Sequence, residues 1–171
     1  YGYIYVGGNT RIDSEGNQYM FNKSLGGNVF GAGSGRDSNS IRVSGSNTKG
    51  TNVVVADNAY VERGIYGGGS FGYCTETTNI YITGGVVDGK SGGVRVTNLT
   101  TKSYDGTIQG GVYGGSCQNR GNNVNIYMTG GLVKTGIYGG SNAFGTLSGN
   151  ANIVIVGGQV GTSAVPANVH G

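Results

Sequence analysis

The amino-acid sequence predicts an all-β fold, namely a parallel β-helix (β-solenoid) of about five coils with loop or hairpin insertions. Three observations predict this fold. Short apolar motifs recur along the whole chain, glycine pairs follow them, and no segment has the apolar spacing of an amphipathic helix. A strand–turn repeat of this size cannot bury its apolar face alone, so neighbouring coils must stack in register. Residues 1–171 are therefore predicted to form one β-solenoid domain, expected to be a segment of a longer repeat array or a polymerising subunit.

The composition supports ordered strands and turns. Glycine occupies 38 positions and proline only one, without the three-residue glycine period of collagen. The 12 tyrosines, with isoleucine and valine along the whole chain, distinguish the sequence from a disordered segment. Short apolar bursts between Gly, Asn, Ser and Thr are typical of strands joined by turns.

The first strand of each coil is predicted from a motif that alternates apolar and other residues and ends in two glycines. Its copies lie at residues 4–8, 80–85, 126–131 and 153–158. Period-two alternation buries one set of side chains and turns the other outward. The set expected in the core is Ile4, Val6, Ile80, Ile82, Ile126, Met128, Ile153 and Ile155. The set expected outside is Tyr5, Tyr81, Tyr127 and Val154.

A further copy of this strand follows from a gap-free alignment of the segments before Tyr66 and Tyr138. The alignment places Val54 on Ile126 and Val61 on Val133, so we expect a first strand at residues 53–55.

A shorter second strand follows the glycine pair at residues 86–87, 132–133 and 159–160. The glycine pairs are expected at the corners of the coil. A sharp corner needs a positive φ, which is costly for any residue that carries a Cβ atom.

The third strand is predicted from an apolar residue, an aromatic residue and a glycine. Copies lie at residues 29–31, 65–67, 112–114 and 137–139, with a degenerate copy at 169–171. The apolar position is always Ile or Val, and we expect it in the core. The next position accepts Phe, Tyr or His, so we expect it at the surface or in a bend.

The distance between copies predicts insertions. The shortest cycle runs from residue 113 to residue 138, which suits one coil of three short strands. The longer cycles predict insertions at residues 13–25, 36–50 and 90–106. Within the second of these, residues 41–43 are expected to pair with residues 53–55 as an arm.

Stacked coils should align the outward aromatic residues into two exposed columns. One column is Tyr5, Tyr81 and Tyr127, and the other is Phe30, Tyr66, Tyr113, Tyr138 and His170. Two interpretations remain open. The columns are internal ladders, each pair contributing about 0.5–1.5 kcal/mol, or they are docking strips for a polysaccharide, a host surface or a neighbouring surface, since exposed tyrosine is a common anchor.

The charge pattern argues against a nucleic-acid partner. The 11 Lys and Arg residues are spread singly along the chain, and the net charge is only +3. Nucleic-acid binders concentrate positive charge on one face. No apolar run is long enough to span a membrane, and no signal peptide is present. A targeting segment is therefore expected outside this stretch of chain.

Catalytic chemistry finds little support in the residue inventory. His170 is the single histidine, which leaves no His-based triad and no multi-histidine metal site. Asp57, Glu62 and Asp88 are the carboxylates that stacking would bring together, and we interpret them as a solvated polar face rather than a glycosidase pair. Residues 66–74 have the glycines of a calcium-binding β-roll but lack its aspartate. We therefore predict no enzyme, no cofactor, and no catalytic, cofactor-binding or metal-binding residue.

Cys74 and Cys117 each lie a few residues after an aromatic motif, in the same bend of consecutive predicted coils. A coil-to-coil disulfide is geometrically possible. The alternative is two isolated thiols, because the two cysteines follow their motifs at different offsets.

With its repeats laid out, the chain resembles the glycine-rich parallel β-helix regions of adhesin-like surface proteins of bacteria and methanogenic archaea. The Tyr-Gly-Gly segments at residues 66–69, 113–116 and 138–141 carry this resemblance, together with the strands at 80–85 and 126–131. The resemblance implies an exported protein at the cell surface, with a stalk, adhesive or envelope role. It transfers no catalytic residue.

Three functions compete at this point. The first is a non-catalytic surface stalk or adhesin segment. The second is a self-assembling subunit of an extracellular filament or sheath, since open ends of a solenoid expose strand edges that invite end-to-end addition. The third is a polysaccharide-active enzyme, which only fold-level analogy supports.

Overall fold

The computed structural model describes residues 1–13, 27–33, 48–70, 72, 74–91, 96–98, 103–104, 110–116, 121–142 and 146–171. Within these residues the chain contains β-strands and no helix. The strands pair in parallel in two curled sheets, and one further pair is antiparallel. The prediction of an all-β fold built on parallel strands is therefore confirmed.

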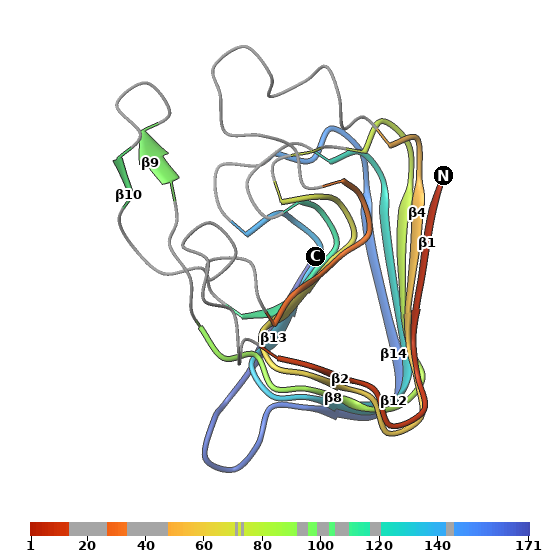
Figure 1. The fold of residues 1–171 in the computed structure, drawn as a ribbon, viewed down its shortest axis with the longest axis vertical. Helices are drawn as coiled ribbons and strands as arrows, with labels where there is room; N and C mark the ends of the chain where they lie inside the picture. Colours follow the sequence, from red (N-terminus) through yellow and green to blue (C-terminus); the bar gives the residue numbers. More distant parts are fainter. Residues whose placement is uncertain are drawn as a thin grey trace.

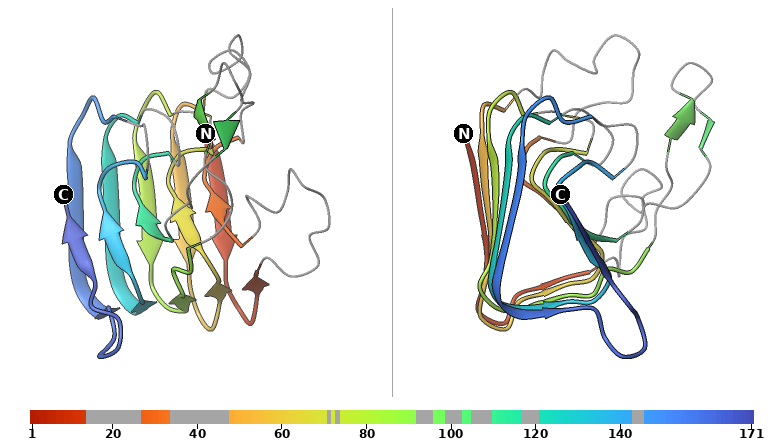
Figure 2. Two further views of the ribbon diagram at one scale, coloured as in Figure 1. Left: turned by 90° about the vertical axis from the view of Figure 1, so that its left-hand side faces the viewer. Right: turned by 180° about the vertical axis from the view of Figure 1, so that it is seen from behind.

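The parallel strands line three faces of the molecule, which form the three sides of one outline in Figure 1. The first face consists of β1 (Gly2–Val6), β4 (Thr51–Val55), β7 (Thr78–Ile82) and the first parts of β12 (Val124–Val133) and β14 (Ala151–Val160). The second face consists of β2 (Arg11–Ile12), β5 (Tyr60–Val61), β8 (Val86–Val87) and the last parts of β12 and β14. The third face consists of β3 (Val29–Phe30), β6 (Gly64–Tyr66), β11 (Gly111–Tyr113), β13 (Gly136–Tyr138) and β15 (Asn168–His170). Figure 2 shows the strands of the first face side by side, with β1 at one end and β14 at the other.

Like residues lie beside like residues on each face. On the first face, Asn79 pairs with Asn52 on one side and with Asn125 on the other. On the third face, Val112 lies between Ile65 and Ile137. This register lets one apolar side chain cover the next along the stack, which a one-residue slip would abolish.

The inward side chains of the three faces form one apolar core. Val53, Ile80 and Ile126 share one level of the first face, and none of them is exposed to solvent. Burial of a side chain of this size contributes about 1.5–3 kcal/mol. The predicted alternation of inward and outward residues is confirmed for these strands. On β14 the inward Ile155 is 39% exposed, because within the described chain β14 has a strand neighbour on one side only.

The predicted alignment of the second copy is wrong by one residue on the first face. Val53, not Val54, shares its position with Ile80 and Ile126. The alignment of Val61 is correct, since Val61 pairs with Val87, which pairs with Val133. The corner between β4 and β5 contains one residue more than the later corners, and a gap-free alignment cannot register that difference.

Positive φ values occur at the corners, as predicted for the glycine pairs. The second glycine of each pair adopts them, with φ of 63° at Gly8, 74° at Gly85, 82° at Gly131 and 86° at Gly158. In the corner between β4 and β5 this conformation falls on Asp57, with φ of 56°. The Asp57 carboxylate accepts a hydrogen bond from the Gly8 backbone N–H at 2.8 Å, which ties two neighbouring corners together.

Buried threonines connect the first face to the turn that leaves the third face. The Thr51 hydroxyl donates to the Gly67 carbonyl, and the Thr78 hydroxyl donates to the Gly114 carbonyl, both at 2.6 Å. Both side chains are almost fully buried. An unpaired carbonyl there would cost about 1–3 kcal/mol, so these bonds hold the turn in place.

The predicted insertions are described only in part. Within residues 90–106, β9 (Val96–Asn98) and β10 (Ser103–Tyr104) form the antiparallel pair. Residues 41–43 lie outside the described residues, but the arm expected between them and residues 53–55 is wrong, because residues 53–55 pair with β1 on one side and with β7 on the other.

Candidate functional site

The third face carries a continuous column of stacked aromatic rings. Successive ring centroids are 4.8–5.6 Å apart and the ring planes differ by 7–14°. The rings, in order along the stack, belong to Phe30, Tyr66, Tyr113, Tyr138 and His170. The column follows from the parallel pairing of β3, β6, β11, β13 and β15, which places each ring directly beside the next.

The prediction that this whole column is exposed is wrong. Tyr66 is fully buried and Tyr113 is 6% exposed, and with Phe30 and Tyr138 they form a second apolar cluster, separate from the main core. Residues after the third face reach the rings from outside. The Asn142 side-chain amide, for example, donates to the Tyr66 hydroxyl at 3.1 Å. The motif Tyr-Gly-Gly does not reveal this cover, because it comes from another part of the chain.

The stacking decides what this column can contact. Tyr66, Tyr113 and Tyr138 each have a ring on both sides, so their faces already contact other rings. Sugars bind aromatic residues through an open ring face. The arrangement therefore supports the interpretation of an internal ladder for these three rings.

The second predicted column is interrupted. Tyr81 and Tyr127 stack on the outer side of the first face with centroids 5.5 Å apart. Tyr5 does not continue this column, because Val54 pairs with Tyr5 on one side and with Tyr81 on the other. Tyr81 and Tyr127 are half-buried, whereas Tyr5 is 56% exposed.

A hollow of about 480 Å³ lies beside the end of the aromatic column that carries His170. Its described lining combines ring atoms, hydroxyl and amide groups and glycine backbone, and it contains no Lys, Arg, Asp or Glu. These lining residues are Gly89, Ser91, Gly110, Tyr113, Thr135, Tyr138, Gly140, Ser141, Asn142, His170 and Gly171.

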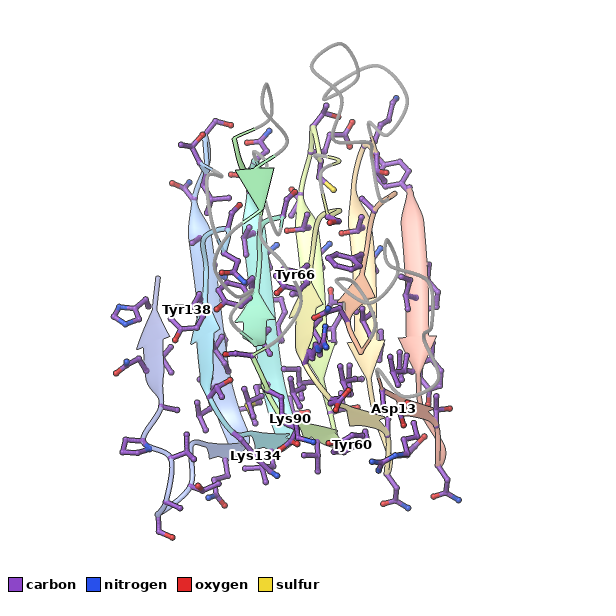
Figure 3. The ribbon with its side chains drawn as sticks, turned by 60° about the vertical axis from the view of Figure 1, so that its left-hand side comes forward. Asp13, Tyr60, Tyr66, Lys90, Lys134 and Tyr138 are labelled. Atoms are coloured by element: carbon purple, nitrogen blue, oxygen red, sulfur yellow. The ribbon has the colours of Figure 1, made fainter. Side chains whose placement is uncertain are left out.

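A network of charged and polar side chains crosses the second face, perpendicular to its strands. The Tyr60 hydroxyl donates to Asp88 at 2.7 Å, and Lys134 from the next strand forms an ion pair with the same carboxylate. The Arg11 guanidinium lies over the Tyr60 ring, 4.1 Å from its centroid. Lys90 adds ion pairs with Glu62 at 3.4 Å and with Asp88 at 3.7 Å. Figure 3 shows Tyr60, Lys90 and Lys134 together along this face, apart from Tyr66 and Tyr138.

The carboxylates of this network are engaged by cations. Glu62 and Asp88 share Lys90, so stacking does bring these two predicted residues together. Asp57 has other partners, the Tyr5 hydroxyl and the Gly8 amide. A glycosidase pair needs one protonated carboxyl and one free carboxylate facing a substrate. The lysines hold Glu62 and Asp88 as ion-paired carboxylates instead, which is the geometry of a stabilising polar face.

The network makes the stability of the fold depend on pH. Burial by itself would raise the pKa of Asp88, but hydrogen bonds from Lys134 and Tyr60 and the charges of Lys134 and Lys90 outweigh it and lower that pKa below its usual value. A carboxyl whose pKa is lower in the folded than in the unfolded state stabilises the fold above the unfolded pKa, and this stabilisation is lost as the pH falls through the folded pKa. We therefore expect Asp88→Asn to lower the free energy of unfolding at pH 7.

Urea unfolding at pH 7 and at about pH 3 measures this contribution. The stability difference between the wild type and Asp88→Asn is expected to shrink at the lower pH, because the carboxyl of the unfolded chain then takes up a proton before the native carboxyl does. Asp13→Asn serves as the matched control, because its ion pair is with Arg11, whose side chain is largely exposed to solvent. A difference for Asp88→Asn that stays constant between the two pH values would contradict the assignment.

Cys74 is a buried free thiol, 2% exposed. Burial raises the pKa of this thiol to about 11, against a smaller lowering by its hydrogen bond with Thr51. Cys117 lies outside the described residues. Because the Cys74 thiol is free, the structure favours the alternative of isolated thiols over the Cys74–Cys117 disulfide. Low thiol reactivity would not prove the bond, because burial alone makes Cys74 unreactive.

Among the described residues, no group of three or more His, Cys, Asp or Glu side chains is placed to hold a metal ion. In the same part of the chain, no helix has the length and apolar character needed to cross a membrane. Comparison with family models, curated proteins and solved structures finds no match to this chain.

Sequence reasoning missed the polar ladders inside the stack. The side-chain amide of Asn125 donates to the Asn79 oxygen at 2.9 Å, and that of Asn79 donates to the Asn52 oxygen at 3.1 Å. The buried Thr51 and Thr78 bonds were missed too. The signal was present, because Thr-Asn precedes the apolar residues at both 51–52 and 78–79.

Proposed function

We propose that this chain is a non-catalytic β-solenoid of about five coils that acts as a structural or adhesive segment of an exported cell-surface protein. In this proposal the stack of parallel strands is a stiff spacer. Outward side chains on its faces contact the surroundings. No enzyme activity and no cofactor belong to it.

One observation carries the proposal: equivalent residues of successive repeats occupy the same level on all three faces. Asn79 lies between Asn52 and Asn125, Val87 between Val61 and Val133, and Tyr113 between Tyr66 and Tyr138. A repeat that stacks in this way is stabilised chiefly by its neighbours. Such a design favours length and stiffness over a single reactive site.

The state of the polar groups also supports a non-catalytic role. The carboxylates of Glu62 and Asp88 are held by Lys90 and Lys134. The hydroxyls of Thr51 and Thr78 are committed to backbone carbonyls. These groups stabilise the stack, and that use competes with proton transfer to a substrate.

The Tyr81–Tyr127 pair tests whether the outer ladder is structural. The double substitution Tyr81→Ser/Tyr127→Ser is expected to lower the free energy of unfolding by about 1 kcal/mol or more, because it removes a stacked pair. Tyr81→Phe/Tyr127→Phe keeps both rings and should stay within about 0.5 kcal/mol of the wild type. Urea unfolding measures the stability, and retention on insoluble neutral polysaccharides measures attachment. Unchanged stability with lost attachment would show that this pair is a docking strip instead.

The exposed edge of β14 favours a second candidate, a self-assembling subunit of a filament or sheath. Its inward Ile155 is 39% exposed and the adjacent Val156 is 75% exposed. A parallel edge with exposed apolar residues accepts a further strand. Size-exclusion light scattering with negative-stain imaging distinguishes the candidates. Fibres that grow with concentration support assembly, and a monodisperse particle at all concentrations supports the spacer.

A further inference from the structure

The outer side of β1 carries three tyrosines that differ from the stacked ones. Tyr1, Tyr3 and Tyr5 are 85%, 69% and 56% exposed. Tyr3 and Tyr5 alternate along β1 and Tyr1 directly precedes it, so they lie on the same side of the first face, with successive Cα atoms about 6.6 Å apart. The strip they form spans about 13 Å, which is longer than a single pyranose ring.

Two of these rings are held in a fixed orientation. The Tyr5 ring lies against Gly7, since a Cβ atom on Gly7 would be 2.6 Å from Tyr5 Cζ, and the Tyr5 hydroxyl donates to Asp57 at 3.1 Å. The Tyr1 ring lies against Gly50, where an added Cβ atom would be 3.1 Å from Tyr1 Cε1, and its hydroxyl donates to Glu76 at 2.8 Å. A side chain that is already oriented loses less entropy when a ligand binds.

Despite these contacts Tyr1 and Tyr5 remain exposed to solvent, as does Tyr3. This distinguishes the strip from Tyr66, Tyr113 and Tyr138, whose faces contact other rings. An open aromatic face has a negative potential that attracts the C–H groups of a sugar ring. Exposed aromatic residues at this density are typical of an interaction surface rather than of ordinary protein surface.

The charges beside the strip indicate which ligand it takes. The carboxylates of Asp57 and Glu76 lie at its two ends, bonded to the hydroxyls of Tyr5 and Tyr1. These bonds raise the pKa of both phenols, so the rings stay neutral. Carboxylate oxygens accept hydrogen bonds from sugar hydroxyls, whereas they repel an anionic polymer.

We propose that Tyr1, Tyr3 and Tyr5 form a binding platform for a neutral polysaccharide. The rings stack on successive sugar rings of an extended chain, and Asp57 and Glu76 accept hydrogen bonds from its hydroxyl groups. This inference rests on the adhesive part of the proposed function and names its ligand class. It does not depend on the structural role of the Tyr81–Tyr127 ladder.

Co-sedimentation of residues 1–171, tagged at the carboxyl end, with insoluble cellulose, chitin and mannan tests the platform. We expect retention on at least one of these neutral polymers and weaker retention on immobilised polygalacturonate. The triple substitution Tyr1→Ala/Tyr3→Ala/Tyr5→Ala is expected to weaken retention about tenfold. The three side chains are exposed, so the variant should keep the wild-type far-ultraviolet spectrum and unfolding midpoint.

Gly7→Ala provides a sharper variant that leaves all three tyrosines in place. The three atoms nearest to the added Cβ belong to the Tyr5 ring, so the ring must move while the backbone can stay. We expect retention to fall severalfold without loss of stability. Gly140→Ala is the matched control, since no atom lies within 4 Å of its added Cβ, and its retention should equal that of the wild type.

Three results would overturn the platform: no retention on any neutral polymer, retention that the triple substitution leaves unchanged, or stronger retention on polygalacturonate. Tyr81→Ser/Tyr127→Ser separates this inference from the proposed function. If that variant loses stability but is still retained on the polysaccharide, the Tyr81–Tyr127 ladder is structural and binding depends on other residues, as expected for the platform on β1. If the chain fails to bind while this variant still loses stability, the structural role stands and only the platform is wrong.

Discussion

Gly67→Ala is expected to destabilise the fold by about 3 kcal/mol or more. The added Cβ atom would overlap the carbonyl oxygen of Gly114, which belongs to the next repeat, and would lie 2.8 Å from Thr78 Cβ. Both neighbours are buried, and the Thr78 hydroxyl donates to that same carbonyl. The methyl group would therefore push two neighbouring repeats apart and break the hydrogen bond between the Thr78 hydroxyl and the Gly114 carbonyl. Urea unfolding followed by circular dichroism measures the loss.

Gly140→Ala is the control for this substitution too. Gly140 follows Gly139 in the turn after β13, just as Gly68 follows Gly67 after β6, but its Cβ atom would meet nothing within 4 Å. Its stability should change by no more than about 0.5 kcal/mol. Equal losses of stability for the two substitutions would show that the close contact between Gly67 and the next repeat is not the cause of the effect.

Tyr66→Ala is expected to cost about 3–5 kcal/mol, the range for loss of a buried aromatic side chain. Tyr66 is fully buried and stacks on Phe30 at 5.0 Å and on Tyr113 at 5.3 Å. Its loss would leave a cavity between two rings that cannot close, because the backbone on either side is held by the parallel pairing of β3, β6 and β11.

Two control variants separate the contribution of the buried Tyr66 ring from that of its hydroxyl and from the effect of removing any tyrosine ring. Tyr66→Phe keeps the stack and removes the bond from Asn142, for an expected cost of about 1 kcal/mol. Tyr5→Ala removes an exposed ring and should cost much less than Tyr66→Ala. A Tyr66→Ala variant as stable as Tyr5→Ala would refute the burial of the column.

The aromatic column of the third face and the tyrosines of the β1 region have different surroundings in the proposed β-solenoid. The rings from Phe30 to His170 stack on one another along the third face. The side chains of Tyr1, Tyr3 and Tyr5 remain exposed to solvent. Whether a tyrosine stacks on another ring thus depends on the residue that the next strand places beside it: Tyr81 lies beside Tyr127, whereas Tyr5 lies beside Val54.

Much of the strand arrangement was predictable because it depends on local pattern. Alternation over residues 80–82 and 126–128 placed Ile80 and Ile126 in the core, and the structure confirms this. The glycine pairs marked the corners, since positive φ at Gly85 and Gly131 is a property of the residue itself. The order of the third-face column also followed from the repeat, because equal motifs in parallel strands occupy equal positions.

The candidate sites were less predictable because they depend on contacts between distant residues. The sequence could not show that Asn142 reaches Tyr66, or that Val54 separates Tyr5 from Tyr81. The charged network was anticipated only as three carboxylates, Asp57, Glu62 and Asp88, of which Glu62 and Asp88 do meet. The lysines that pair with them carry no motif: Lys90 lies two residues after Asp88, and Lys134 comes from the next repeat.

By itself the sequence determined an all-β chain of parallel strands, with Ile and Val inside and glycine at the corners, because backbone conformation and side-chain alternation are set by neighbouring residues. Only the tertiary structure decided the exact register of β4, the burial of Tyr66 and Tyr113, and the exposure of Tyr1, Tyr3 and Tyr5. Solvent exposure is a property of everything packed around a side chain. One extra residue in a corner, or one amide from a later turn, is enough to change it.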